Sequence, residues 1–180
     1  MVFEEQKLQG VYIINPDVFY DERGYFFESF KYNELKEKLN CTFVQDNEVF
    51  SANVDTIRGL HYQLDNPQAK LVHVLSGSIM DVVVDIRTSS SSFGRSLCVN
   101  LDHKNHRMLF IPEGFAHGYL VLEKNTLVHY KCTDYYNPKS EYGIRWDDSD
   151  LDINWEVIRP ILSEKDRSLP LLKDQKMLPR

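Results

Sequence analysis

The sequence lacks any long apolar run and any pattern that would send the chain to a membrane or out of the cell. No window reaches the roughly 18 uninterrupted apolar residues of a membrane-spanning helix. The first residues, Met1-Val2-Phe3-Glu4-Glu5, do not have the basic and then apolar order of a signal peptide. We therefore expect a cytoplasmic protein with no membrane contact.

Cysteine is scarce, and basic residues do not dominate. The 180 residues include three cysteines, Cys41, Cys98 and Cys132, which are widely spaced and form no CxxC pair. This usage is typical of structural thiols in a reducing compartment. The net charge of −6 argues against a nucleic-acid-binding domain, because such a domain needs a concentrated basic patch.

Motifs for nucleotide cofactors and for metals are also missing. The chain has no GxGxxG and no GxxxxGK[ST], so no nucleotide cofactor is expected. Jelly-roll metal sites often use a His-x-His pair, but His61 and His73 each stand alone here, and His103 and His106 lie in a polar loop. Because no set of three or four ligands with the usual spacing can be assembled, we expect no metal.

Short strand-like segments, by contrast, recur along the whole chain. Ten tyrosines and ten phenylalanines, many of them in alternating stretches, favour β-structure. A helix is predicted at 32–39, where Leu35 and Leu39 are four residues apart. The predicted strands are 11–14, 25–30, 42–50, 56–63, 70–75, 78–86, 95–101, 107–111, 115–122, 126–133 and 143–146.

Many short strands, turns with Gly, Pro and Asn, and few short helices predict an all-β sandwich or barrel of the jelly-roll kind. The length fits one domain over 1–180, with its core at about 8–150 and a tail at about 151–180. Ser76-Gly77 is compatible with a hairpin between two of the strands. The segment from Leu162 onward is polar and contains prolines, so we expect it to wrap the surface.

One strand-like stretch carries an unusual set of charges. Arg58 and His61 lie in Ile57–Gln63, and Lys70 follows nine residues after the histidine. A buried or half-buried run rarely contains two cations and an imidazole for packing reasons alone. If the histidine is a base, the cations can hold an anionic substrate and a developing oxyanion.

A series of longer motifs points to one family. In chain order they are Asp21–Gly24 with Phe27–Ser29, Phe43–Asn47, Arg58–Gln63, Asp85–Arg87, Ile111–Gly118, Tyr130–Tyr136, Trp146–Asp148 and Leu162–Asp166. Over about residues 8–172 the chain resembles the dTDP-4-dehydrorhamnose 3,5-epimerase family. The resemblance implies a cupin-type jelly roll, no cofactor, a homodimer, and a part in making dTDP-L-rhamnose for cell-surface polysaccharide.

The resemblance also implies four catalytic roles. Such an enzyme inverts C3 and C5 of a dTDP-linked 4-keto-6-deoxyhexose, which requires a base, a cation near the ketone oxygen, and an acid on the other face. His61 matches the base and Asp166 its carboxylate partner. Lys70 matches the residue that stabilises the enolate oxygen, and Tyr130 matches the acid, since a phenol with a pKa of about 10 stays protonated at neutral pH.

Further residues match positions that bind the substrate. Arg23, Arg58 and Lys165 correspond to contacts with the diphosphate or sugar. Glu28, Gln45 and Asn47 correspond to the residues that recognise the thymine of the nucleotide. Phe26 or Phe27 would stack on that thymine. His117 corresponds to a sugar contact, Glu141 to a further substrate-binding position, and the pair Tyr135-Tyr136 could shape the sugar pocket.

Three alternatives stay open at this point. Relatives of the same fold act on C3 only, or on a different nucleotide-linked 4-keto-6-deoxy sugar, with the same base. A non-catalytic sugar-nucleotide-binding cupin should lack one of His61, Tyr130 or Asp166, and all three are present. A metal-dependent cupin would need the ligand set that the sequence does not supply.

Overall fold

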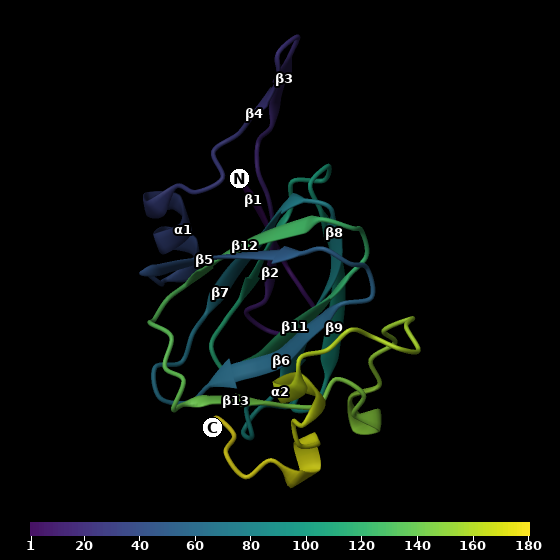
Figure 1. Ribbon diagram of the computed structural model, residues 1–180. Helices are drawn as coiled ribbons and strands as arrows, with labels where there is room; N and C mark the ends of the chain where they lie inside the picture. Colours follow the sequence, from purple (N-terminus) through teal and green to yellow (C-terminus); the bar gives the residue numbers. More distant parts are fainter.

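The computed structural model describes residues 1–180 as two antiparallel sheets that face each other, with a separate small hairpin (Figure 1). The first sheet has the order β1 (Val2–Glu5), β2 (Tyr12–Asn15), β10 (Met108–Ile111), β7 (Lys70–Ser76), β12 (Thr126–Cys132) and β5 (Gln45–Ser51). The second has the order β13 (Glu141–Gly143), β6 (Ile57–Gln63), β11 (Phe115–Val121), β8 (Ser78–Asp85) and β9 (Ser96–Asp102). The predicted all-β jelly roll is confirmed.

Helices are few and short, as predicted. The helix expected at 32–39 is α1 (Tyr32–Leu39), whose buried Leu35 packs against the outer face of the six-stranded sheet. Three further short helices were not predicted: η1 (Ser149–Leu151), α2 (Glu164–Arg167) and η2 (Leu172–Asp174). None of the helices is both long and apolar enough to cross a membrane.

The main core lies between the two sheets. Val72, Val74 and Val128 from the six-stranded sheet pack against Val83 and Val121 from the five-stranded sheet in a cluster of 15 buried residues. This alternation follows from the strand period of two residues, which places every second side chain on the inner face. The same layer, displaced toward one end of the sandwich, contains the polar cavities described below.

The C-terminal tail is more than a surface wrap. Leu151, Trp155 and Leu172 are buried against the outer face of the five-stranded sheet, where they meet Val82 and Val84 of β8. Strand β8 is therefore apolar on both faces, which explains its unbroken valine run. Most residues from Leu162 onward are exposed, as expected for a segment that wraps the surface, and Leu172 in addition contributes to this second core.

Two connections between consecutive strands cross from one sheet to the other. The turn at Ser76-Gly77 does not form a hairpin, because β7 pairs with β10 and β12 whereas β8 pairs with β9 and β11. The connection from β11 to β12 crosses in the same way. A glycine with φ of +78° at Gly77 permits a tight turn, but the packing of two sheets decides where the next strand goes.

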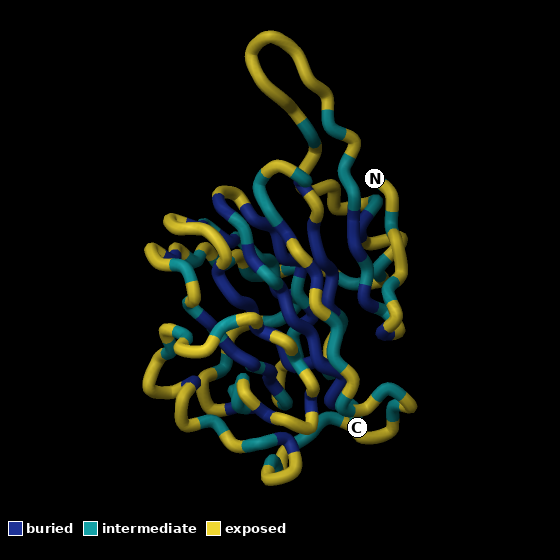
Figure 2. The backbone as a smooth tube through the Cα atoms, turned by 90° about the vertical axis from the view of Figure 1, so that its right-hand side faces the viewer, coloured by how far each residue is buried: buried dark blue, intermediate teal, exposed yellow.

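Strands β3 (Phe19–Asp21) and β4 (Gly24–Phe26) pair only with each other and project away from both sheets (Figures 1 and 2). Figure 2 shows the loop of this hairpin exposed along its length. The predicted strand at 25–30 ends at Phe26, and β1 and β3 were not predicted. The hairpin therefore carries aromatic residues that stay largely exposed on the single chain, among them Tyr20 and Phe26.

Candidate active site

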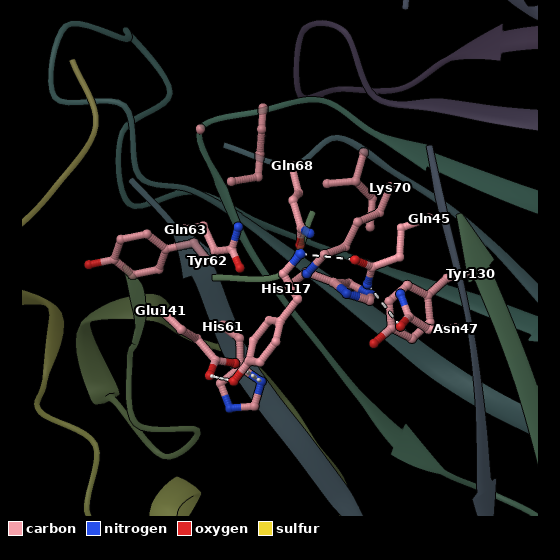
Figure 3. A pocket seen from close by; sticks show the side chains of 14 residues that line it. Gln45, Asn47, His61, Tyr62, Gln63, Gln68, Lys70, His117, Tyr130 and Glu141 are labelled. Atoms are coloured by element: carbon pink, nitrogen blue, oxygen red, sulfur yellow. Dashed lines mark hydrogen bonds and ion pairs between the residues drawn. The ribbon is translucent and has the colours of Figure 1, made fainter. Parts of the chain in front are cut away.

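Two adjoining cavities lie between the sheets, and four side chains line both of them. Their volumes are about 350 Å³ and 280 Å³. The shared residues are His61 on β6, Lys70 at the start of β7, His117 on β11 and Tyr130 on β12. Figure 3 shows these side chains around the larger cavity, drawn from both sheets. Three of the four predicted catalytic residues therefore meet at one place.

Strand pairing accounts for this arrangement. His61 and His117 are direct cross-strand partners in the five-stranded sheet. In the six-stranded sheet Lys70 pairs with Cys132, two residues beyond Tyr130, so the lysine and the tyrosine lie on the same inner face. The histidines and the Lys70–Tyr130 pair thus approach the cavity from opposite walls.

The fourth predicted catalytic residue, Asp166, reaches the cavity wall from the tail. Its Oδ1 lies 2.6 Å from Nε2 of His61, and its Oδ2 accepts a 3.4 Å hydrogen bond from the backbone N–H of Gly59. Ser163 caps the short helix α2 that carries it, with its Oγ accepting from the Asp166 backbone N–H at 3.0 Å. Burial would raise the pKa of Asp166, but the hydrogen bond from His61 and the positive charge of the His61 ring hold the pKa of Asp166 below its usual value.

Lys70 and Tyr130 face the cavity without an ion pair to the protein. Burial lowers the pKa of Lys70, an effect that the nearby Cys132, Glu141 and Asp81 partly offset. Burial also raises the pKa of Tyr130 to about 12. A buried ammonium whose charge no carboxylate neutralises at close range is well suited to bind an oxyanion, and a phenol with a raised pKa remains protonated.

Glu141 links β13 to the tail. It pairs with Lys165, and it accepts a 2.7 Å hydrogen bond from the Tyr136 hydroxyl. Burial would raise the pKa of Glu141, but these two hydrogen bonds lower it overall. Its other oxygen lies 3.9 Å from Nδ1 of His61, so Glu141 borders the side of the imidazole that faces the larger cavity.

The remaining predicted binding residues fall into two groups. Gln45 and Asn47 of β5 line the larger cavity, where Gln45 Nε2 donates to Asn47 Oδ1 at 3.0 Å. Arg58 and Lys165 line the smaller cavity. Arg58 donates through Nε to Ser51 Oγ at 3.2 Å and through Nη2 to the backbone oxygen of Phe50 at 3.3 Å.

Comparison with known proteins identifies the family. The family described as dTDP-4-dehydrorhamnose 3,5-epimerase matches residues 5–174. The chain belongs to this family. The dTDP-4-dehydrorhamnose 3,5-epimerase of Methanothermobacter thermautotrophicus is 47% identical over 176 residues, which are 96% of this chain and 95% of that protein. The resemblance stated from the motifs is confirmed.

Solved structures of epimerases share the whole fold. The Legionella pneumophila dTDP-6-deoxy-D-glucose-3,5-epimerase, in complex with dTDP-4-keto-L-rhamnose, has a TM-score of 0.95 at 43% identity and covers 99% of this chain and 97% of its own. ChmJ, a 3′-monoepimerase of Streptomyces bikiniensis in complex with dTDP-quinovose, has a TM-score of 0.87 at 29% identity and covers 93% and 86%. Epimerases of different regiospecificity therefore share this architecture.

Three predicted binding residues do not reach these cavities on their own chain. Arg23 is 86% exposed at the hairpin tip, where it pairs with Asp21. Phe26 is also exposed, and Glu28 pairs with Lys31 instead. Within one chain the hairpin extends away from the sandwich, so the binding role of these three residues stays a prediction.

Sequence reasoning also missed residues of the site. Gln63 and Gln68 line the larger cavity, and Asp81 bonds His117 from behind. A signal for Asp81 existed in the sequence, since it is the one charged residue in Ser78–Val84, a strand that is otherwise almost entirely apolar. A lone carboxylate in such a run needs a buried partner.

Proposed function

We propose that the chain catalyses cofactor-independent epimerisation of dTDP-4-dehydro-6-deoxy-D-glucose at C3 and C5, giving dTDP-4-dehydro-L-rhamnose. The observation that carries this proposal is the meeting of His61, Lys70 and Tyr130 at one cavity, with Asp166 behind the histidine. Both carbons neighbour the C4 ketone, so each can lose its proton as an enolate forms.

His61 is the base in this proposal. Because an ionised carboxylate only accepts hydrogen bonds, Asp166 favours the tautomer in which Nε2 carries the proton. The lone pair on Nδ1 is then available to remove the proton from the substrate. As the imidazole becomes positively charged, Asp166 stabilises that charge, which is the part played by the aspartate of a catalytic triad.

Lys70 and Tyr130 complete the reaction from the other wall of the cavity. The ammonium of Lys70 donates to the C4 oxygen as negative charge develops there. Tyr130 then returns a proton to the carbon. Because His61 and Tyr130 come from opposite sheets, the proton arrives on the face opposite to the one it left, and the configuration inverts.

The polar residues at the rim are suited to hold the nucleotide. Arg58 and Lys165 supply positive charge for a diphosphate in the smaller cavity. The side-chain amides of Gln45 and Asn47 offer donors and acceptors that complement a thymine edge. Glu141 and His117 border the space between these groups and the base, where the sugar would lie.

We further propose that the working form is a homodimer in which each hairpin completes the partner's site. The β3–β4 hairpin exposes Phe19, Tyr20, Tyr25 and Phe26. An exposed aromatic cluster of this kind is typical of a protein–protein contact. Arg23, Phe26 and Glu28 would then meet the nucleotide bound by the other copy. The three free cysteines fit a reducing compartment, and we propose a cytoplasmic location.

We also propose that residues 1–180 act as one domain rather than as a core with a dispensable tail. Asp166 and Lys165 come from the tail, and Leu172 is part of the second core. Truncation before Ser163 should therefore remove both activity and stability.

The test of the reaction is proton exchange in deuterated water. The enzyme is incubated with dTDP-4-keto-6-deoxy-D-glucose, and proton NMR follows deuterium entry at C3 and C5 separately. Exchange at both carbons is expected, and His61→Ala should abolish both while circular dichroism stays native. Exchange at neither carbon in the wild type would reject this substrate. Exchange at C3 alone would favour the second candidate function, a 3-epimerase. The similarity of this chain to the 3′-monoepimerase ChmJ supports that candidate.

The test of the dimer is complementation between two inactive variants. His61→Ala lacks the base, and a hairpin variant with Arg23→Ala and Phe26→Ala lacks the proposed contribution to the partner. In a random mixture of the two, about a quarter of all sites combine an intact base with an intact hairpin. Recovery of about that share of wild-type activity is expected, and no recovery despite exchange of subunits would reject the shared site.

A further inference from the structure

Asp81 is a fully buried carboxylate that faces away from solvent in the middle of strand β8. Its side chain is 0% exposed, and its neighbours Val82, Val83 and Val84 are fully buried apolar residues. A carboxylate in such surroundings is costly unless it is hydrogen-bonded and paired. Its one hydrogen-bonding partner is His117, whose Nε2 lies 3.0 Å and 2.9 Å from the two carboxylate oxygens.

The opposite edge of the His117 ring opens on the cavities. His117 lines both of them, and it stands directly across from His61 on the neighbouring strand. Nδ1 of His117 has no hydrogen-bonding partner on the protein. The Tyr119 hydroxyl is the only fully buried side-chain nitrogen or oxygen without a hydrogen-bonding partner. Since Nδ1 of His117 also lacks a partner, it must be accessible rather than sealed in the protein. The atom of His117 that remains for a ligand is therefore Nδ1.

Two histidines thus present the same ring edge to one substrate. Each has Nε2 against a buried carboxylate, Asp166 for His61 and Asp81 for His117. Since an ionised carboxylate only accepts, Nε2 of His117 carries the proton and Nδ1 of the neutral ring is an acceptor. Lys70, by contrast, can only donate. The two side chains therefore fit different sugar oxygens, a ketone for Lys70 and a hydroxyl for His117.

We propose that Asp81 is a positioning residue of the epimerase: it holds His117 in the Nε2–H tautomer, so that Nδ1 accepts a hydrogen bond from a hydroxyl of the substrate sugar. The proposal rests on the proposed function for the identity of the substrate. It assigns a role in the reaction to a residue that touches neither the substrate nor the reacting atoms. Asp81 acts only through His117, as the outer partner of a histidine generally does.

The experiment combines three variants, Asp81→Asn, His117→Gln and the double variant, with one control. Asp148→Asn is the matched control, because Asp148 is also a buried aspartate, it lines neither cavity, and it accepts from the backbone N–H groups of Asp150 and Leu172. Epimerisation kinetics give kcat and KM for each variant. Nitrogen NMR of protein labelled in histidine reports which ring nitrogen of His117 carries the proton.

We expect Asp81→Asn to lower kcat/KM by about 10- to 100-fold, and the control to change it by less than about threefold. The double variant should be no slower than His117→Gln alone, because both changes remove the same interaction. In the wild type, Nδ1 of His117 should be unprotonated. In Asp81→Asn, in which an amide can also donate to Nε2, the Nδ1–H form should appear.

Three results would overturn the proposal. A folded Asp81→Asn with the kinetics of the control would show that the carboxylate has no part in the reaction. Losses that multiply in the double variant would mean that Asp81 does not act through His117. A protonated Nδ1 in the wild type would refute the tautomer even if no variant folds. If the wild type exchanges no substrate proton, the proposed reaction fails, while the NMR measurement still decides the state of His117.

Discussion

Replacing Asp166 by asparagine tests a pair that the chain assembles from segments 105 residues apart. The two carboxylate oxygens accept from different groups, Oδ1 from His61 at 2.6 Å and Oδ2 from the Gly59 backbone N–H at 3.4 Å. An asparagine keeps the shape but has one acceptor and one donor. If its NH₂ faces His61, Nε2 must become an acceptor, and the proton moves to Nδ1, the atom that should remove the substrate proton.

The size of the effect follows from the bond that is lost. The Asp166 side chain is 6% exposed, and a hydrogen bond to a charged group in such a place contributes about 1.5–3 kcal/mol. At about 1.36 kcal/mol per factor of ten, this predicts a fall in kcat of roughly 10- to 150-fold. A fully wrong tautomer would cost more, up to the fall of about 10⁴ known from the serine-protease triad.

The assay is deuterium exchange at C3 and C5 of dTDP-4-keto-6-deoxy-D-glucose, followed by proton NMR. Because one base serves both carbons, we expect both rates to fall by a similar factor. Asp174→Asn is the control, since Asp174 is exposed in the same tail and its side chain makes no hydrogen bond or ion pair. If folded Asp166→Asn exchanges both protons within about threefold of the wild-type rates, the pairing has no catalytic role.

Three further outcomes are expected. The alkaline limb of the pH profile of kcat should lie below pH 10.5, because burial lowers the pKa of Lys70 from 10.5. Tyr130 does not set this limb, since burial raises its pKa to about 12. A limb above pH 10.5 would contradict the assignment to Lys70. Burial would raise the pKa of Asp85, but hydrogen bonds from Arg87 and two serines hold it at about 2 instead of 3.8. It thus stabilises the fold above about pH 4 and loses this effect as the pH falls toward 2. Asp85→Asn should lower the free energy of unfolding on the order of 2 kcal/mol at pH 7, and by much less at pH 2, as urea titration would measure. Gly59→Ala, with φ of +105° and a Cβ placed 2.5 Å from a carbonyl oxygen of β11, should lower stability by about 1–3 kcal/mol and slow exchange; an unchanged melting temperature would refute the close approach.

Local signals in the sequence were sufficient for most elements. The helix at 32–39 was predicted with its observed bounds, since apolar residues four apart form one face of a helix. The strand that carries His61 and the one that carries Tyr130 were predicted within one residue at each end. Side-chain alternation within these strands is a property of the extended backbone itself, so it needs no tertiary information.

Pairings between distant segments could not be predicted in this way. The turn at Ser76-Gly77 is compatible with a hairpin, yet β7 and β8 lie in different sheets. No short-range signal distinguishes the two outcomes, because the choice depends on which faces the finished sandwich buries. For the same reason the sequence does not indicate that the hairpin with Arg23 projects away from the cavities of its own chain.

The sequence by itself determined the chemical groups of this protein: a histidine and two cations in one stretch, a tyrosine on a later strand, and an aspartate near the end of the chain. The tertiary structure decided which of these groups meet. It placed Asp166 against His61 across 105 residues and Asp81 against His117 across 36. The physical reason is that hydrogen bonds of this kind act over about 3 Å, a distance that sequence separation does not encode and that only the packing of the two sheets and the tail establishes.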